Sequence, residues 1–269
     1  MYKLVALDMD GTLLNSDKII TDRNKQAIAN AREKGVTVIL ASGRPLAGMR
    51  EKLEELQLTS DKDFVVSSNG SYVHRVSDNK EIHSQIITGK EAKHVAKLAE
   101  QLGVHMHAFS IEHGLITPKN NPYTEHEAVI NGLSIKEFDF SQLDDDHQII
   151  KAMFADAPEE LDRVTPLLDK ELHNEFTIVR SAHIFLEFLH LESNKGVGVA
   201  AVAKYLGINA DEVISMGDAE NDHHMMKYAG LGVAMGNATK ETKALADHIT
   251  DTHDNSGVAQ VIEEFILNV

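Results

Sequence analysis

The sequence predicts an α/β protein: a core with a parallel sheet, divided along the chain by an inserted α+β domain. At the start of the chain and again after Asn194, short apolar strands alternate with helices, which is typical of parallel sheets with right-handed crossovers. From about Tyr72 this alternation gives way to short strand-like pieces and single helices. We therefore expect core segments at 1–82 and 191–269 and an inserted domain at 83–190.

The first core segment is expected to contain three strands and two helices. Each strand is a short apolar run, and the run before Asp8 is too short and too β-branched for a helix. Thr21 is a capping residue and Gly35 a stop signal for the first helix. The expected strands are the run that ends at Asp8, 36–41 and 64–67; the expected helices are 21–33 and Pro45 to about Leu56.

The inserted domain and the second core segment follow from the same signals. In the inserted domain we expect helices at 90–102 and 158–172, strands at 105–109, 149–154, 176–179 and 184–189, a polar segment around 120–122 and an acidic loop at 144–146. In the second core segment we expect helices at 196–206, 222–229 and 258–267 and strands at 212–216 and 231–234.

Two carboxylates, Asp8 and Asp10, stand one residue apart where the first apolar run ends. Residues i and i+2 share one face of a strand, so the two side chains can converge at its carboxyl end. Open parallel sheets bind ligands at this edge. Two acids so close repel each other unless a cation or a shared proton compensates, which favours a functional site.

Taken alone, this segment is also compatible with a purely structural role. Asp and Gly are common turn formers, so Asp8 to Gly11 could be an ordinary turn after a strand. An EF-hand loop is excluded, because Thr12 and Leu13 occupy its third ligand position and its glycine position. Residues elsewhere in the chain must decide between a structural turn and a functional site.

Composition limits the possible partners. The 269 residues hold 42 Asp plus Glu against 26 Lys plus Arg, a formal charge of −16, which argues against general nucleic-acid or anionic-membrane binding. The chain has no cysteine, so disulfides and thiolate metal sites are excluded. No apolar run reaches membrane-spanning length and no secretory signal is evident, so we expect a cytoplasmic protein.

Polar residues also follow the other core strands. Ser42-Gly43-Arg44 ends the second strand, Gly217-Asp218 ends a later one, and Asn194-Lys195-Gly196 opens a helix. In a parallel sheet these points lie along one edge. Carboxylates with carbonyls and waters suit Mg²⁺, whereas backbone amides, Ser and Lys suit a phosphoryl group.

The chain resembles the haloacid dehalogenase-like superfamily in four ordered motifs. They are Asp8-Met9-Asp10-Gly11-Thr12-Leu13, Ser42-Gly43-Arg44-Pro45, Asn194-Lys195-Gly196 and Gly217-Asp218-Ala219-Glu220-Asn221-Asp222. More narrowly, the chain is similar to the Cof-type phosphatases, whose cap domain is inserted between the second and third motifs. The resemblance implies a Rossmann-like core with an inserted α+β cap that selects the substrate.

The resemblance also implies a mechanism of phosphoryl transfer. Asp8 would be the nucleophile that forms an aspartyl-phosphate, and Asp10 the general acid and base. Lys195 would neutralise the nucleophile and the developing charge. Ser42 and the Gly43 amide would bind the phosphoryl oxygens.

Two further binding residues and a metal site are implied. Asn194 and Arg44 are candidate substrate contacts, although Arg44 could equally cap a helix start. Mg²⁺ would be held by the Asp8 carboxylate, the Asp10 carbonyl, Asp218 and Asn221. Asp222 would orient Lys195 or a metal-bound water rather than take part in chemistry.

Several other signals are discounted. Gly196 to Ala201 matches a loose dinucleotide pattern without its strand–turn context, and indicates close helix packing instead. His105 and His107 share a strand face but have no third ligand nearby, and the adjacent His223 and His224 diverge on a helix. The sequence assigns no role to His223 and His224, and Glu187 could face either a pocket mouth or solvent.

The leading hypothesis is a Mg²⁺-dependent phosphatase of small phosphate monoesters, with sugar phosphates as the expected class. A phosphotransferase or mutase shares the aspartyl-phosphate and is the alternative within enzymes. A non-catalytic regulatory protein on this scaffold would be expected to lack a nucleophile, lysine or metal acid, and all are present here. The expected partner is a small phosphorylated metabolite, and the oligomeric state does not follow from the sequence.

Overall fold

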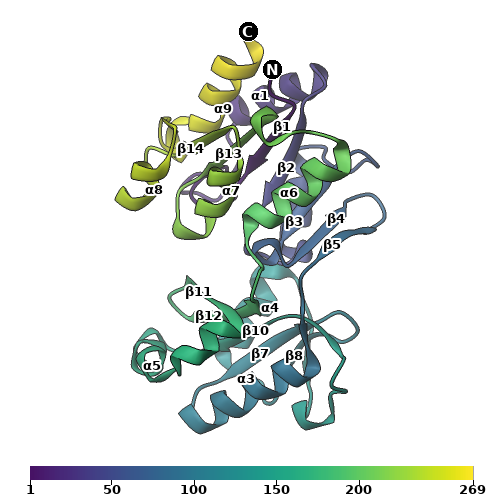
Figure 1. The fold of residues 1–269 in the computed structure, drawn as a ribbon, viewed down its shortest axis with the longest axis vertical. Helices are drawn as coiled ribbons and strands as arrows, with labels where there is room; N and C mark the ends of the chain where they lie inside the picture. Colours follow the sequence, from purple (N-terminus) through teal and green to yellow (C-terminus); the bar gives the residue numbers. More distant parts are fainter. Residues whose placement is uncertain (269) are drawn as a thin grey trace. The chain divides into compact units, whose positions relative to one another are not determined.

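The computed structural model describes residues 1–268, which form two compact units. The core unit comprises Met1–Ser84 and the chain from Asn194 onwards, and the cap unit comprises Gln85–Ser193 (Figure 1). These divisions lie two and three residues from the predicted boundaries after 82 and after 190. The predicted α/β class is confirmed, with a largely parallel core sheet and a separate α+β insertion.

The core sheet joins the two distant segments of the chain. Its strand order is β15-β14-β13-β1-β2-β3-β4-β5, and β1 pairs in parallel with both β13 and β2 (Figure 1). Within residues 1–268, β4 and β5, at one edge, are the strands of this sheet that depart from the parallel arrangement. The strands are β1 (Leu4–Leu7), β2 (Thr37–Ala41), β3 (Phe64–Ser67), β4 (Tyr72–Arg75), β5 (Glu81–Ser84), β13 (Val213–Gly217), β14 (Leu231–Ala234) and β15 (His248–Ile249).

Helices cover both faces of the core sheet, because alternate strand residues point to opposite sides. On β1, Val5 and Leu7 pack with α1, α2 and α9, whereas Leu4 and Ala6 pack with α6 and α7. All four side chains are fully buried, which explains why the run is apolar throughout. The core helices are α1 (Asp22–Glu33), α2 (Arg50–Glu55), α6 (Lys195–Leu206), α7 (His223–Tyr228), α8 (Lys240–Leu245) and α9 (Gly257–Ile262).

The glycines at the start of α6 permit close packing, as predicted from their small size. A Cβ on Gly198 would lie 2.4 Å from Val66 Cγ1, and one on Gly196 would lie 2.6 Å from the His224 carbonyl carbon. Any larger residue would push α6 away from the sheet and from α7. This packing matters because α6 begins with Lys195.

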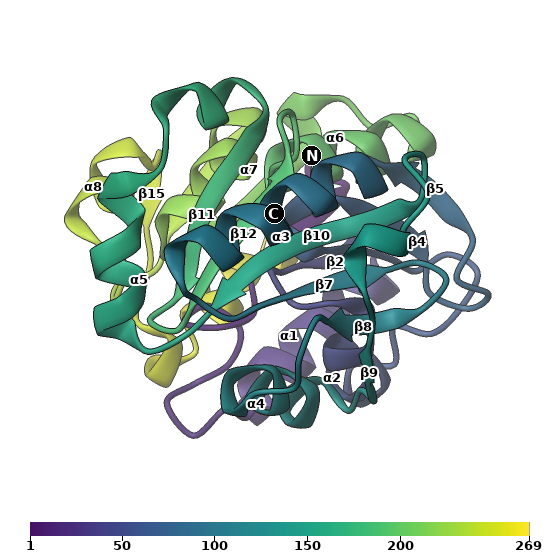
Figure 2. The same ribbon diagram turned by 90° about the horizontal axis from the view of Figure 1, so that it is seen from below.

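The cap unit has its own sheet, with the order β11-β12-β10-β7-β8-β9 and β6 beside β10. Helices α3 and α5 pack on one face, and α4 packs on the other beside Phe109 and Met153 (Figure 2). The strands are β6 (Ile87–Thr88), β7 (Met106–Ser110), β8 (Gly114–Thr117), β9 (Ile135–Glu137), β10 (Gln148–Ala155), β11 (Phe176–Ala182) and β12 (Phe185–His190). The helices are α3 (Gly89–Leu102), α4 (Pro122–Asn131) and α5 (Pro158–Val164).

Two predictions for the cap unit need correction, and the last helix of the core differs from its prediction only in its helix type. The predicted helix at 158–172 is wrong beyond Val164, because Pro166 has no N–H to continue it and only short 3₁₀ turns follow. The polar segment near Pro122 opens helix α4, since Asn121 Oδ1 accepts hydrogen bonds from two amides of its first turn. The last predicted helix continues past Ile262 as a π-helical turn, Glu263–Leu267.

Among residues 1–268, no helix is both long enough and apolar enough to cross a lipid bilayer.

Candidate active site

Three carboxylates meet at the carboxyl edge of the core sheet. One oxygen from each of Asp8, Asp218 and Asp222 lies within 4.8 Å of the others. Asp8 follows β1 and Asp218 follows β13, and these two strands are parallel neighbours. Asp8 is 6% exposed and Asp222 is fully buried, so their charges are largely removed from water.

Lys195 is the counter-ion inside this cluster. It is the first residue of α6 and is fully buried, and its Nζ donates to Asp8 Oδ1 at 2.5 Å and to Asp222 Oδ1 at 2.6 Å. Burial disfavours its charge, but the carboxylates of Asp222 and Asp8 outweigh that effect and raise the pKa of Lys195 above its ordinary value. Lys195 therefore stays an ammonium group.

Asp222 uses both of its oxygens within the protein. Oδ1 accepts from Lys195, and Oδ2 accepts from the backbone amides of Asp218 and Ala219 at 3.0 and 3.1 Å. These bonds fix the Lys195 ammonium and the loop that carries Asp218 at the same time. Asp222 therefore acts as a positioning residue in this geometry.

The remaining two acids hold protons more tightly than usual. Burial raises the pKa of Asp8, against the lowering effect of the Lys195 ammonium, and the Asp222 and Asp218 charges raise it further. Burial together with the Asp222 charge raises the pKa of Asp218 to about 6, although a hydrogen bond from Thr12 opposes the shift. The cluster thus carries more negative charge than Lys195 alone can balance.

Gly11 and Thr12 lie directly against the side chain of Asp218. Thr12 Oγ1 donates to Asp218 Oδ1 at 3.0 Å. Gly11 has a φ of +88°, and a Cβ there would lie 2.4 Å from Asp218 Oδ2. Sequence reasoning gave Thr12 no role, although its place in the first motif was the available signal.

Asp10 lies apart from the three clustered acids. Arg44 binds its carboxylate in a bidentate manner, with Nε and one terminal nitrogen each at 2.8 Å, and Lys18 Nζ lies 3.0 Å away. Burial would raise the pKa of Asp10, but the hydrogen bonds and charges of Arg44 and Lys18 outweigh it, so the pKa is lowered. Sequence reasoning missed Lys18, which lies in a loop outside every motif.

The end of β2 meets the end of β3. Ser42 is buried, and its Oγ accepts from the Arg44 amide at 3.2 Å. Asn69 Oδ1 accepts from Asn221 Nδ2 at 3.1 Å, and a Cβ on Gly43 would lie 3.1 Å from Asn69 Nδ2. The second and fourth motifs are therefore joined through Asn69, which lies in the turn after β3 and belongs to none of the four motifs.

Asn194 sets the start of α6. Its Oδ1 accepts from the Val197 amide, so it caps the helix that begins with Lys195. His223 bonds Thr242 Oγ1 at 2.8 Å rather than an acid of the cluster, and the neighbouring His224 is exposed. The two histidines thus diverge, as expected for adjacent residues on a helix.

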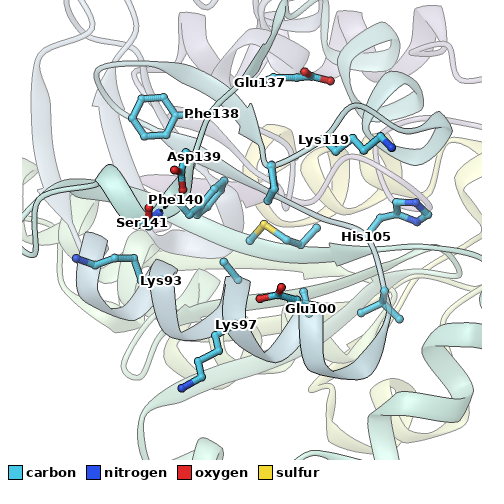
Figure 3. Close-up of a pocket in the computed structure, with 15 residues that line it drawn as sticks. Lys93, Lys97, Glu100, His105, Lys119, Glu137, Phe138, Asp139, Phe140 and Ser141 are labelled. Atoms are coloured by element: carbon cyan, nitrogen blue, oxygen red, sulfur yellow. Dashed lines mark hydrogen bonds between the residues drawn. The ribbon is translucent and has the colours of Figure 1, made fainter.

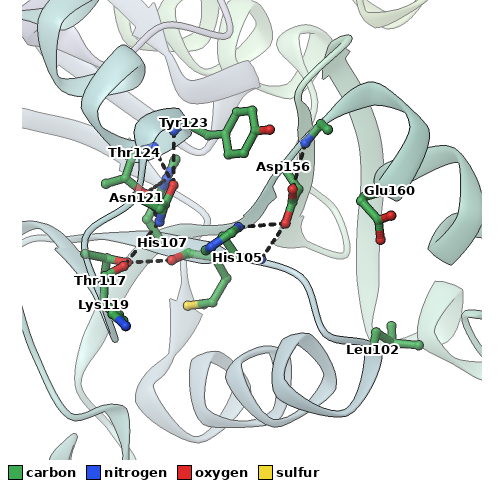
Figure 4. Close-up of polar contacts among 12 residues, drawn as sticks. Leu102, His105, His107, Thr117, Lys119, Asn121, Tyr123, Thr124, Asp156 and Glu160 are labelled. Carbon is green, nitrogen blue, oxygen red and sulfur yellow. Dashed lines mark hydrogen bonds and ion pairs between the residues drawn. The ribbon is translucent and has the colours of Figure 1, made fainter.

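Polar residues of the cap unit form separate contacts (Figure 4). His105 Nδ1 lies 2.8 Å from Asp156, and buried His107 lies 3.1 Å from Thr124 Oγ1, so the two histidines share no ligand. Glu187 is 2% exposed and accepts a 2.7 Å hydrogen bond from Lys151 Nζ. Of the two alternatives that the sequence left open for Glu187, the solvent face is therefore excluded.

The cap unit also holds a cavity of about 950 Å³ between α3 and the segment after β9 (Figure 3). Lys93, Lys97 and Lys119 carry its positive charges, and Phe138 and Phe140 line it with apolar surface. None of the clustered acids contributes to this cavity. The chemistry-bearing residues of the core are thus distinct from it.

Comparison with known proteins identifies the family. The model of the haloacid dehalogenase-like hydrolases matches residues 5–262. The chain belongs to this family. YxeH of Bacillus subtilis, provisionally named as a phosphatase, is 36% identical over 99% of both chains. A second protein of that organism, YcsE, named as 5-amino-6-(5-phospho-D-ribitylamino)uracil phosphatase, is 34% identical over 98% of this chain and 96% of its own.

Solved structures of this family are similar to the structure of this chain. A haloacid dehalogenase-like hydrolase from Bacteroides thetaiotaomicron superposes with a TM-score of 0.88 at 31% identity, covering 99% of this chain and 100% of its own. A sugar phosphatase of subclass IIB superposes with a TM-score of 0.80 at 26% identity, covering 98% of each chain. The protein is a phosphatase of the Cof type, as its four motifs predicted.

Proposed function

We propose that this phosphatase hydrolyses small phosphate monoesters with Mg²⁺, through a phosphoryl group carried on Asp8. The observation that carries the proposal is the Lys195 ammonium held between Asp8 and Asp222 beside Asp218. Such a cluster can accept an anionic substrate only when a cation offsets its charge.

The residues around Asp8 fit a hard divalent cation. Three carboxylates stand against one ammonium, and burial together with the neighbouring acid charges raises the pKa values of Asp8 and Asp218. Mg²⁺ prefers carboxylate, carbonyl and water oxygens, and the Asp8 and Asp218 carboxylates, the Asp10 carbonyl and the Asn221 amide would supply them. The bound cation would screen the repulsion between these acids and the phosphoryl oxygens.

The proposed reaction has two displacements. Asp8 attacks phosphorus while the bond from phosphorus to the ester oxygen breaks, and Asp10 donates a proton to the departing oxygen. Asp10 then takes a proton from water, which attacks the aspartyl-phosphate and releases inorganic phosphate. Lys195 holds the Asp8 carboxylate in place and offsets the charge that develops.

In the proposed cycle, the ion pair between Arg44 and Asp10 controls the protonation state of Asp10. While Arg44 binds it, Asp10 is a carboxylate with a lowered pKa and a poor proton donor. The phosphoryl oxygens compete for the same guanidinium, which binds such groups in a bidentate manner. When Arg44 turns to the substrate, Asp10 loses its bidentate partner and keeps only the exposed Lys18 ammonium. Its pKa then rises, and it can take up the proton that it must donate.

Ser42, the Gly43 amide and Asn194 complete the proposed phosphoryl site. Backbone hydrogen bonds to Val66 and Asn69 hold Ser42 in place, and Gly43 lies against the Asn69 side chain. Asn194 stays a predicted substrate contact in addition to capping α6.

Small phosphorylated metabolites, with sugar phosphates as the leading class, are the proposed substrates. This rests on the names of similar proteins, one a phosphatase of a phosphoribityl compound and one a sugar phosphatase. A mutase that passes the phosphoryl group to a sugar is the alternative. A cytoplasmic location and the absence of nucleic-acid and membrane partners stay predictions.

Release of inorganic phosphate tests the proposal. Wild-type protein should release phosphate from an aryl phosphate and from members of a panel of sugar phosphates, and a chelator should abolish release. Asp8→Asn should lose the activity, whereas Asp17→Asn, at an exposed loop position, should keep it. Little release from any substrate by the wild-type protein, with transfer between sugars instead, would favour the mutase.

A further inference from the structure

A second group of metal-ligating side chains lies in the cap unit. Among residues 1–268, only two groups of acids and histidines bring three ligand atoms within 4.8 Å of one another. One is the acid cluster of the core, and the other consists of Glu112, His113 and His147. We propose that this second group binds a Zn²⁺-class transition metal ion.

The three residues come from two adjacent segments. Glu112 and His113 lie in the turn between β7 and β8, and His147 directly precedes β10. The Ile111 amide donates to the Gln148 carbonyl at 3.1 Å, so the backbone holds the two segments together. The ligands therefore face one another without any bound ion.

The distances suit a four-coordinate ion after small side-chain movements. His113 Nδ1 lies 3.8 Å from Glu112 Oε1, and His147 Nδ1 lies 4.0 Å from Glu112 Oε2. Bonds of 2.0–2.1 Å in a tetrahedron place ligand atoms about 3.3 Å apart. The Glu112 side chain is 72% exposed and can close this gap by rotation, leaving a fourth position to water.

Ser110 gives the site the outer support that histidine ligands need. Its Oγ lies 2.8 Å from His147 Nε2 and also accepts from the His113 amide at 2.9 Å. When Nε2–H donates to Ser110, His147 Nδ1 carries a lone pair and faces Glu112. One hydroxyl thus orients His147 and holds the turn that carries the other two ligands.

The ligand set selects against Mg²⁺ and for a borderline metal. Two imidazoles and one carboxylate form a set known for Zn²⁺, whereas Mg²⁺ prefers oxygen ligands. The simpler account is aromatic packing, since the His113 ring stacks on His147 with centroids 5.1 Å apart and also contacts Phe138. Packing alone predicts no metal uptake.

Titration of the full chain with Zn²⁺ in excess Mg²⁺ separates these accounts, because the excess Mg²⁺ competes for the oxygen ligands of the core acids but not for imidazole nitrogens. We expect one equivalent of Zn²⁺ to bind at micromolar concentration and to raise the melting temperature. His147→Gln and His113→Gln should each weaken binding at least tenfold.

His94→Gln is the matched control, because His94 lies 3.3 Å from Glu175 in the same unit but has no second histidine. It should bind Zn²⁺ like the wild type. Circular dichroism without Zn²⁺ checks that each variant is folded. No uptake by the wild type, or equal uptake by a folded His147→Gln or His113→Gln variant, would overturn the proposal.

Discussion

Each acid of the active site has a different set of partners, and these partners separate the roles that we propose. Asp222 is saturated by Lys195 and two backbone amides, Asp10 is held by Arg44, and Asp218 receives a single side-chain hydrogen bond from Thr12. Asp8 and Asp218 therefore have the most oxygen capacity left for a cation. Substitutions of single residues around Asp218 therefore test the proposed metal site.

Thr12→Val should weaken Mg²⁺ binding by about 10- to 100-fold, because it removes the hydroxyl that orients Asp218. Thr12→Ser keeps the hydroxyl and should bind Mg²⁺ nearly as well as the wild type. Isothermal titration with Mg²⁺ measures both. Equal loss in the two variants would show that the methyl group, and not the hydrogen bond, matters.

Mg²⁺ binding should also depend on pH through Asp218. Its pKa of about 6 in the metal-free protein means that protons compete with the cation below pH 6. The apparent affinity should fall about tenfold per unit as pH decreases below that value and level off above pH 7. A flat profile between pH 5 and pH 7 would contradict the raised pKa.

The raised pKa of Asp218 also determines the direction in which the stability of the metal-free protein changes with pH. The folded-state pKa of Asp218 lies above its ordinary 3.8, so its contribution is fully present below that value and is lost as pH rises through about 6. Metal-free protein should thus gain more from added Mg²⁺ at pH 7 than at pH 5, as thermal unfolding can measure.

At the scale of elements, the site depends on where strands end and where α6 begins. The φ of Gly70 is +91°, and a Cβ there would lie 2.0 Å from the Asn194 carbonyl oxygen, directly before Lys195. This contact between the end of β3 and the start of α6 fixes the origin of the helix.

Gly70→Ala should therefore displace Lys195 and lower both phosphatase activity and the free energy of unfolding. Gly103→Ala is the matched control, since Gly103 also has a positive φ, +70°, but a Cβ there would meet nothing within 4 Å. It should lose about 1–2 kcal/mol of stability from backbone strain alone and keep its activity. Urea unfolding and phosphate release distinguish the two, and equal effects would contradict the role of the Asn194 contact.

The sequence predicted the elements of the site better than its hydrogen bonds. Alternating strands and helices placed Asp8 and Asp218 along one edge of the sheet, because parallel strands end at one edge. The structure adds that their strands, β1 and β13, are neighbours. The bonds of Thr12 to Asp218 and of Lys18 to Asp10 depend on turn geometry that no periodicity reveals. In the cap unit, the sequence does not predict α4, because its start signal, Asn121-Pro122, is equally typical of a polar connecting segment.

At the scale of the whole molecule, stability in acid depends on a buried histidine of the cap unit. His107 is fully buried, and burial, reinforced by the Lys151 charge, lowers its pKa from 6.5 to about 3. Its folded-state pKa lies below the unfolded value, so the unfolded chain takes up the proton first. Stability is lost as pH falls from about 6.5 towards 3.

Between pH 7 and pH 5, this one group should remove about 2 kcal/mol from the free energy of unfolding. His107→Gln does not titrate and should show a shallower pH dependence than the wild type, even if it is less stable at pH 7. His94→Gln, at an exposed cap position, should keep the wild-type slope. Identical slopes for wild type and His107→Gln in urea unfolding would contradict the assignment.

The central claim is that Asp8 carries the phosphoryl group, and acid quenching during turnover tests it most directly. Asp10→Asn should form the intermediate with a good leaving group but hydrolyse it slowly, because the general base is missing. Mass spectrometry of the quenched variant should find one added phosphoryl group on the peptide that contains Asp8, removable by hydroxylamine. Turnover of an aryl phosphate by Asp8→Asn at the wild-type rate, or a phosphoryl group on another residue, would contradict the account.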